Sequence, residues 1–384
     1  MKLRQLALRF IVLLGIVSLF ADMTYEGARS ISGPYLSLLG ASGAAVGIIV
    51  GLGELIGYGI RGISGYLSDK TQRYWLLTFI GYIINLAAVP LLALAGSWQM
   101  AAMLIILERL GKAIRTPARD AMLSYATKHT GRGWGFGLHE ALDQIGAVIG
   151  PLALAVLLYL HESYRFGFAV LLIPALLSIL TLVLARISFP KPQMLEVATP
   201  SLHTTGFSRT FWIYLLAVGF VGAGFVDFAL IAYHFQKAAT VSPAWIPFLY
   251  AIAMAVDGLA ALIMGRLFDL KGLSVLALVT AITSLFAPLV FLGSFTAVLV
   301  GMILWGISMG AQESIMRAAV ATFVPPQKRG AGYGMLNLVF GVFWAAGSAI
   351  KGLFYDISLI YLVVFSLVMQ LISIPLFLSI KAKN

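Results

Sequence analysis

Charged residues recur at helical spacing inside two of the most apolar stretches of the chain. In the stretch 98–121 they are spaced four, three and four positions apart, at Glu108, Lys112, Arg115 and Arg119, with Arg109 beside the first. In the stretch 8–38 they are spaced four and three apart, at Asp22, Glu26 and Arg29. Residues three or four positions apart share one face of a helix, so each stretch is expected to present one charged face.

Other ionisable residues lie within apolar stretches along the chain: Glu54, His139, Glu140, Asp143, Asp227 and Asp257. A charged side chain that faces lipid near the middle of a bilayer costs about 3 kcal/mol or more. So many charges are tolerated only if they face one another or a water-filled cavity. One polar cavity between two halves of the molecule is the simplest arrangement.

The residue types suggest a division of roles. Burial disfavours the charged form of a carboxyl group, which suits acids that load and release protons. We predict five such proton-coupling residues: Asp22, Glu26, Glu54, Glu140 and Asp143. Arginine keeps its proton and can hold an anion. We predict that substrate binds among Glu108, Arg109, Lys112, Arg115, Arg29, His139, Asp227 and Asp257.

A structural alternative applies to each charged pair. Glu108 with Lys112, or Glu26 with Arg29, could form a buried ion pair that fixes helix packing and touches no substrate. His139 is expected to form hydrogen bonds rather than to bind a metal ion. No metal site and no other cofactor is predicted.

The elements that position these residues are membrane-spanning helices. The chain has 384 residues, of which 60% are hydrophobic and 11% charged, and its mean hydropathy of +0.96 excludes an ordinary water-soluble domain. Apolar stretches of about 20 residues, the length that crosses a bilayer, follow one another along the sequence. We predict about twelve helices, at 8–38, 43–66, 74–95, 98–121, 134–160, 164–187, 209–236, 243–268, 274–294, 296–322, 332–354 and 357–380.

Lysine and arginine gather in alternate loops. They lie at Lys2, Arg4, Arg9, Lys70, Arg73, Lys128, Arg132, Arg186, Lys191, Lys271, Lys328, Arg329, Lys381 and Lys383. The positive-inside rule makes these loops cytoplasmic and places both termini inside. We therefore expect a multi-pass protein of the inner (plasma) membrane, with its first stretch a span rather than a signal peptide. The net charge of +11 then reflects contact with anionic lipid, and no nucleic-acid partner is expected.

The second half of the chain repeats motifs of the first. Gly65, Leu67 and Asp69 recur 200 positions later as Gly265, Leu267 and Asp269, and the segment 132–137 recurs at 329–334. We predict an all-α membrane protein with two pseudo-symmetric six-helix halves, 1–188 and 209–384, joined by a cytoplasmic linker at 189–208. A parallel repeat of this kind occurs in transporters.

At these residues the sequence resembles the major facilitator superfamily. The loop signature G-x-L-x-D-R/K-x-G-R is met by Gly65, Leu67, Asp69, Lys70 and Arg73, with Gln72 in place of a glycine. The antiporter signature G-x-x-x-G-P is met by Gly146, Gly150 and Pro151, although Leu154 and Ala155 replace the glycines that usually follow. The arginine pattern of that branch is also changed, because Arg109 is followed by Ala113. The resemblance implies the superfamily's fold and points to its prokaryotic efflux branch.

The repeated charges suggest gates. We predict that Asp69 and Asp269 pair with Arg119 and Arg317, in sites that include Gly65 and Arg73, and that these latches open as the protein alternates between states. A static staple that assists folding is the alternative.

The expected function is proton-coupled secondary active transport by alternating access, with export of a small amphipathic or cationic molecule. An organic-anion transporter, a divalent-metal exporter for an ion such as iron, and a receptor or lipid scramblase derived from a transporter are alternatives. The chain lacks a G-x-x-x-x-G-K-S/T phosphate-binding loop, and we expect neither an enzyme nor an ATP-driven pump. The expected partners are the substrate, protons and membrane lipid, and the protein is expected to be a monomer.

Overall fold

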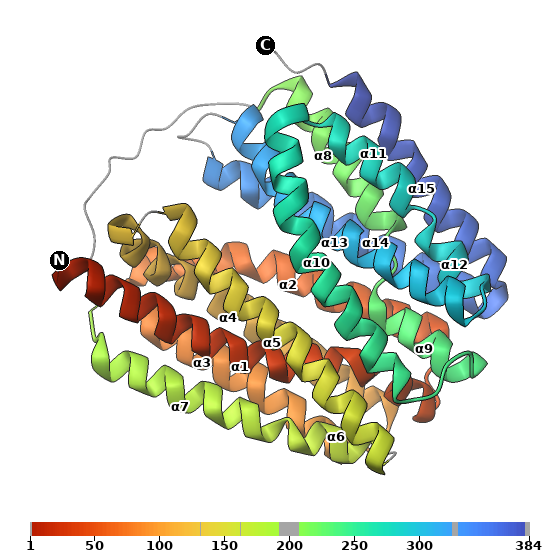
Figure 1. Ribbon diagram of the computed structural model, residues 1–384, viewed down its shortest axis with the longest axis horizontal. Helices are drawn as coiled ribbons and strands as arrows, with labels where there is room; N and C mark the ends of the chain where they lie inside the picture. Colours follow the sequence, from red (N-terminus) through yellow and green to blue (C-terminus); the bar gives the residue numbers. More distant parts are fainter. Residues whose placement is uncertain (1, 131, 162, 192–206, 325–328, 381–384) are drawn as a thin grey trace. The chain divides into compact units, whose positions relative to one another are not determined.

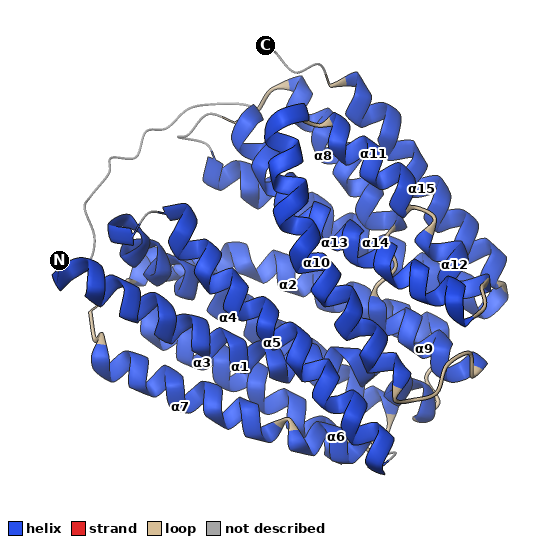
Figure 2. Cartoon of the chain, in the orientation of Figure 1, coloured by secondary structure: helices blue, strands red, loops and turns tan. Residues whose placement is uncertain are grey.

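A computed structural model describes residues 2–130, 132–161, 163–191, 207–324 and 329–380. Within helices, the side chains of 2–3, 69, 127–130, 132–136, 269, 317, 321 and 329–331 lie outside the described part. All regular secondary structure in the described residues is helical, as Figure 2 shows. The expected all-α class is thereby confirmed.

The helices follow the apolar stretches closely. In the first half they are α1 (Lys2–Leu38), α2 (Gly43–Thr71), α3 (Tyr74–Leu91), the short 3₁₀ helix η1 (Leu92–Leu94), α4 (Trp98–Thr130), α5 (Arg132–His161), α6 (Tyr164–Val170) and α7 (Leu172–Ser188). In the second half they are α8 (Arg209–Gly224), α9 (Phe228–Ala238), α10 (Trp245–Lys271), α11 (Ser274–Thr283), α12 (Phe286–Leu292), α13 (Phe295–Phe323), α14 (Arg329–Ile357) and α15 (Leu359–Ser379).

Within the described residues, eleven helical stretches are long and apolar enough to cross a membrane. They include consecutive helices that form one stretch, such as α8 with α9 and α11 with α12. The helix α4 is also long, but its charged face makes it more polar than the others. It corresponds to the predicted span 98–121 and brings the eleven stretches to the twelve that were predicted. The helix continues to Thr130, beyond the predicted end at 121. The molecule is a multi-pass membrane protein.

The chain divides into two compact units, and the division runs through α1 and α2. Unit 1 comprises residues 1–31 and 56–200, and unit 2 comprises residues 32–55 and 201–384. In unit 1, α3 packs along α4, α4 contacts α5, and α3 contacts α7 (Figure 1). In unit 2, α10 packs along α13, and α8 packs against both α14 and α15. The division at the 189–208 linker, predicted from the sequence repeat, stays a prediction.

Candidate functional site

Glycines bring α3 and α4 into close contact in unit 1. A Cβ on Gly81 of α3 would lie 2.5 Å from the backbone nitrogen of Arg115, and one on Gly111 of α4 would overlap the backbone of Asn85. Because only glycine allows such an approach, the two helices meet backbone to backbone at this crossing. The crossing places Arg115 of α4 beside Tyr82 of α3.

A second pair of glycines seats α1 against α5. Cβ atoms on Gly146 and Gly150 would overlap the carbonyl oxygens of Leu19 and Met23. These glycines belong to the G-x-x-x-G-P segment, so in this structure that segment has a packing role. The close contact holds the Asp22 turn of α1 in a fixed position against α5.

Between these contacts lies a charge cluster, which we define as Asp22, Tyr25 and Glu26 of α1 together with Lys112 and Arg115 of α4. The ammonium of Lys112 lies 3.8 Å from Glu26 Oε1 and 3.8 Å from the centre of the Tyr25 ring. Lys112 therefore links α4 to α1 by an ion pair and by a cation–π contact.

The acids of the cluster are buried. Asp22 is 5% exposed and Glu26 is 7% exposed. Arg29 Nη1 lies 4.0 Å from Glu26 Oε2, so Glu26 is contacted by two cations. Asp22 Oδ1 is buried and has no hydrogen-bond partner among the described residues. Asp143 of α5, together with Lys112 and Glu26, lies close enough to Asp22 to interact with it electrostatically.

Arg115 is the most unusual member of the charge cluster. Its side chain is fully buried, and none of its three guanidinium nitrogens has a hydrogen-bond partner in the described part of the chain. Its guanidinium carbon lies 4.2 Å from the centre of the Tyr82 ring and 5.7 Å from that of Tyr25. A guanidinium has five N–H donors, so the tyrosine faces leave its hydrogen-bonding capacity unused.

Glu108 and Arg109 form a separate pair one turn nearer the start of α4. Arg109 Nε lies 3.4 Å from Glu108 Oε2, and Asn85 of α3 donates to Glu108 Oε1 at 2.7 Å. The same amide also donates to the backbone carbonyl of Glu108 at 3.0 Å. Lys112, for which a pair with Glu108 was the structural alternative, has its ion-pair contact with Glu26.

Arg119, His139 and Ser18 form a polar network at the other end of the charged face. Arg119 Nη1 donates to Ser18 Oγ at 3.0 Å, and Arg119 Nε donates to Asp120 at 2.9 Å. Ser18 Oγ lies 3.0 Å from His139 Nε2 and 3.4 Å from the Tyr82 hydroxyl. His139 thus has the hydrogen-bonding role expected of it.

The remaining predicted proton-coupling and substrate residues differ in their burial and in the unit to which they belong. Glu54 is half-buried and belongs to unit 2, whereas Glu140 is exposed and Asp143 half-buried on α5 in unit 1. Asp227 and Asp257 are buried in unit 2, at 3% and 2% exposure.

The predicted gates are described only in part. A Cβ added at Gly65 would lie 3.5 Å from Pro117 Cβ, which is ordinary van der Waals contact. Arg73 is exposed, and Arg119 makes the contacts given above. The side chains of Asp69, Asp269 and Arg317 lie outside the described residues, so the latches stay predictions.

Several residues of structural importance were missed by sequence reasoning. Tyr25 and Tyr82 were overlooked because tyrosine is common in apolar helices, and Asn85 because an uncharged amide stands out less than the ionisable residues around it. Only the folded contacts give these residues a role. Lys351 was also missed, although a lysine within the apolar run GSAIKGLF was a usable signal. No group of three or more His, Cys, Asp or Glu side chains that could hold a metal ion occurs among the described residues.

Comparisons with known proteins give the family. Residues 12–348 match the family model of the Major Facilitator Superfamily. An uncharacterized protein of Mycobacterium tuberculosis is 38% identical over 98% of this chain and 93% of its own length. An uncharacterized MFS-type transporter of Methanocaldococcus jannaschii is 35% identical over 45% of this chain and 43% of its own length.

The fold is also that of solved transporters. The crystal structure of a mutant of the nucleoside transporter NupG aligns with a TM-score of 0.79 at 14% identity, covering 96% of this chain and 100% of that one. At this identity the likeness shows the fold alone. The family match, which spans residues 12–348, establishes that the chain belongs to the Major Facilitator Superfamily and is therefore a membrane transporter of a small-molecule substrate, not an enzyme.

Proposed function

We propose that the protein is a secondary active transporter that couples substrate movement to protons by alternating access, and that the charge cluster of unit 1 carries the proton. The observation that carries this proposal is the position of Lys112, shared between Glu26 and the Tyr25 ring at 3.8 Å each. Lys112 also interacts electrostatically with Asp22, so one lysine interacts with two buried carboxyl groups. Binding or loss of one proton changes which contacts Lys112 can make.

Asp22 and Glu26 are the carriers that the geometry favours. Asp22 Oδ1 has no hydrogen-bond partner in the described part of the chain, so a proton can bind there without displacing a contact. Glu26 is contacted by Lys112 and Arg29, which compete with a proton for its charge. Because Lys112 belongs to α4 and Glu26 to α1, a change of protonation alters a contact between two helices.

Arg115 favours an organic anion as the substrate. A buried guanidinium without hydrogen bonds is costly, because its N–H donors have lost their water and gained no acceptor. A carboxylate or phosphate group accepts from such a fork in bidentate fashion. We propose that substrate supplies this acceptor at Arg115 in part of the transport cycle, when the tyrosine ring of α1 has moved away.

Export of a small amphipathic or cationic molecule in exchange for protons is the second candidate. It is favoured by the buried carboxyl group of Asp22, whose Oδ1 has no hydrogen-bond partner among the described residues, so that a cationic substrate would compete with the proton there. The divalent-metal alternative gains no support, because the described residues contain no group of side chains suited to a metal ion.

Transport into liposomes separates these candidates. Benzoate serves as an aromatic carboxylate probe and tetraphenylphosphonium as a lipophilic cation probe, each with and without a pH gradient. We expect the anion to respond to the gradient and Arg115→Gln to abolish that response. Arg165→Gln, which alters an exposed arginine of the same unit, is the matched control. Gradient-driven movement of the cation alone, unaffected by Arg115→Gln, would establish the second candidate instead.

We also propose that the protein works as a monomer in the inner membrane with both termini cytoplasmic. The bias of lysine and arginine towards alternate loops supports this orientation. The chain contains no cysteine, so single cysteines report on topology directly. A membrane-impermeant maleimide should label Gly96→Cys in intact cells and leave Gln72→Cys unlabelled; the reverse pattern would invert the orientation.

A further inference from the structure

The seventh span is broken near its middle. Helix α8 ends at Gly224, residues 225–227 are not helical, and α9 begins at Phe228. The last carbonyl groups of a helix have no N–H partner within it, so the break exposes a row of acceptors. In an apolar interior such acceptors must be satisfied by other groups.

Side chains from three other helices of unit 2 satisfy these acceptors. Lys351 of α14 donates through Nζ to the carbonyl oxygens of Ala223 at 2.6 Å and Phe225 at 2.5 Å. Ser366 of α15 donates to Gly224 O at 2.6 Å, and Trp305 of α13 donates to Val226 O at 2.8 Å. We call the carbonyl oxygens of Ala223 and Phe225, which hold the ammonium, the carbonyl cradle.

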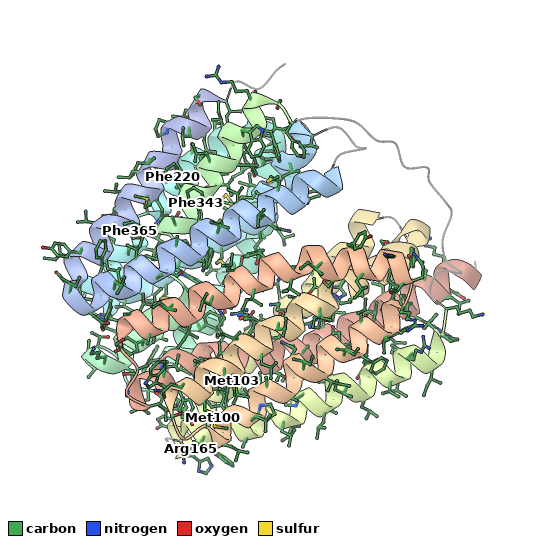
Figure 3. All side chains as sticks on the ribbon, turned by 180° about the vertical axis from the view of Figure 1, so that it is seen from behind. Met100, Met103, Arg165, Phe220, Phe343 and Phe365 are labelled. Carbon is green, nitrogen blue, oxygen red and sulfur yellow. The ribbon has the colours of Figure 1, made fainter. Side chains whose placement is uncertain are left out.

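Close packing of α8 against α14 brings Lys351 to the cradle. A Cβ on Gly347, one turn before Lys351, would overlap the carbonyl oxygen of Ala223. Helical side chains lean towards the N-terminus of their helix, so the Lys351 side chain points back along α14 towards the turn that contacts Ala223. Further along the same contact, Phe220 and Phe343 lie with ring centres 5.6 Å apart, and Figure 3 labels both.

The charges of Lys351 and Asp227 are opposite in sign to the partial charges of the helix ends that they contact. The C-terminal end of a helix carries partial negative charge, and the Lys351 ammonium sits at that end of α8. The N-terminal end carries partial positive charge, and the Asp227 carboxylate accepts from Ala229 N at 2.9 Å at that end of α9. Lys351 is fully buried. Interrupted helices in other transporter folds present the same groups to small cations.

We propose that the break between α8 and α9 is a cation-binding site that recognises a primary ammonium group, and that the Lys351 ammonium is its resident cation. The bound cation holds the two half-helices at their present joint. When it leaves, the carbonyls of Ala223 and Phe225 lose their donor, and α9 is free to change its angle to α8. Lys351 is thus a positioning residue of the seventh span.

Chemical rescue tests the site. Lys351→Ala removes the atoms of a propylammonium ion, so added propylammonium can restore the missing cation. We expect Lys351→Ala to lower the melting temperature of the purified protein by several degrees and propylammonium to recover most of that loss. Tetramethylammonium has the same charge and no N–H donor, so we expect it to recover none. Lys351→Met fills the same space without charge. We expect its melting temperature to lie below that of the wild type and not to recover with propylammonium.

Controls keep the result specific. Lys271→Ala removes an exposed lysine from the end of α10 and should melt near the wild-type temperature, with no response to either ion. Amide hydrogen exchange over residues 223–231 should rise in Lys351→Ala and fall again with propylammonium, which shows that the effect is local. Lys351→Ala protein could fold so poorly that it can be purified only when propylammonium is present in the cells and buffers. If tetramethylammonium does not allow its purification, that result also supports the cation-binding site.

Three results would overturn the proposal: full stability of Lys351→Met, equal rescue by both ions, or no rescue of Lys351→Ala by either. These readouts are stability and exchange, so they do not depend on whether transport is coupled to protons. Failure of this proposal is therefore distinguishable from failure of the proposed function.

Discussion

The guanidinium of Arg115 carries a fixed charge in a fully buried position. Two tyrosine rings contact its faces, while its three nitrogens have no hydrogen-bond partner among the described residues. A cation–π contact contributes about 2 kcal/mol or more when desolvated, whereas burying an ion costs several kcal/mol even after relaxation. Because the guanidinium also lacks hydrogen bonds, we expect Arg115 to lower the stability of the fold.

Arg115→Met should therefore stabilise the protein and abolish transport. Replacement of a buried charge by an apolar side chain of similar length is expected to raise the free energy of unfolding by about 1 to 3 kcal/mol. Thermal unfolding in detergent measures this change. Arg165→Met, at an exposed position, should stay within about 0.5 kcal/mol of the wild type. A marked loss of stability in Arg115→Met would mean that the arginine serves packing instead.

At the scale of the element, apolar length predicts the spans well and their interruptions poorly. The predicted spans 43–66, 98–121 and 332–354 begin within a few residues of α2, α4 and α14. The break at 225–227 was missed because the whole stretch is apolar. The segment GAGFVD contains two usable signals, the glycines and an aspartate before a new helix, but tertiary contacts decide that the helix stops there.

Close packing of α8 on α14 gives a prediction in which two similar changes have opposite signs. Gly347→Ala should lower stability by about 1 to 3 kcal/mol, because its Cβ would overlap the backbone of Ala223. Gly334→Ala, in the same helix, has open space around the added Cβ and should raise stability by about 0.5 to 1 kcal/mol. Thermal unfolding of both variants is the measurement. If Gly347→Ala and Gly334→Ala changed the stability equally, the close contact at Gly347 would not constrain the break at 225–227.

At the scale of the whole molecule, the division into units runs through α1 and α2. Residues 32–55 belong to unit 2, where Tyr233 donates to Ala41 O at 2.9 Å. The carboxylate of Asp356 accepts from Gly43 N at 2.9 Å and Ala44 N at 2.8 Å, at the start of α2. The predicted spans 8–38 and 43–66 leave a short loop between them, but a cap supplied from a position 313 residues away is not visible in a single sequence.

Asp356→Ala should loosen the start of α2 more than the rest of unit 2. Loss of a capping carboxylate costs about 1 kcal/mol. Amide exchange at Gly43 and Ala44 should accelerate, while exchange in α10 and α13 stays near wild type. Asp356→Asn keeps one acceptor oxygen and should show a smaller effect. Unchanged exchange at both amides in Asp356→Ala would show that this cap does not hold α2.

The candidate site shows the same limit, namely that contacts between helices cannot be read from a single sequence. The sequence alone marked Asp22, Glu26, Lys112 and Arg115 as charges on the faces of two helices. It offered no partner for Lys112 across helices, because helical spacing relates residues only within one helix. The contact of Lys112 with Glu26 and the stacking of Arg115 on Tyr82 depend on the glycine-mediated approach of α1, α3, α4 and α5.

Proton flux that accompanies substrate movement is the most direct test of the charge cluster as the proton carrier. Liposomes with wild-type protein and an internal pH indicator are given a gradient of the probe that the transport screen identifies. We predict that protons move with the probe, and that Asp22→Asn combined with Glu26→Gln still exchanges probe across the membrane but moves no protons. An unchanged ratio of protons to probe in the double variant would contradict the account.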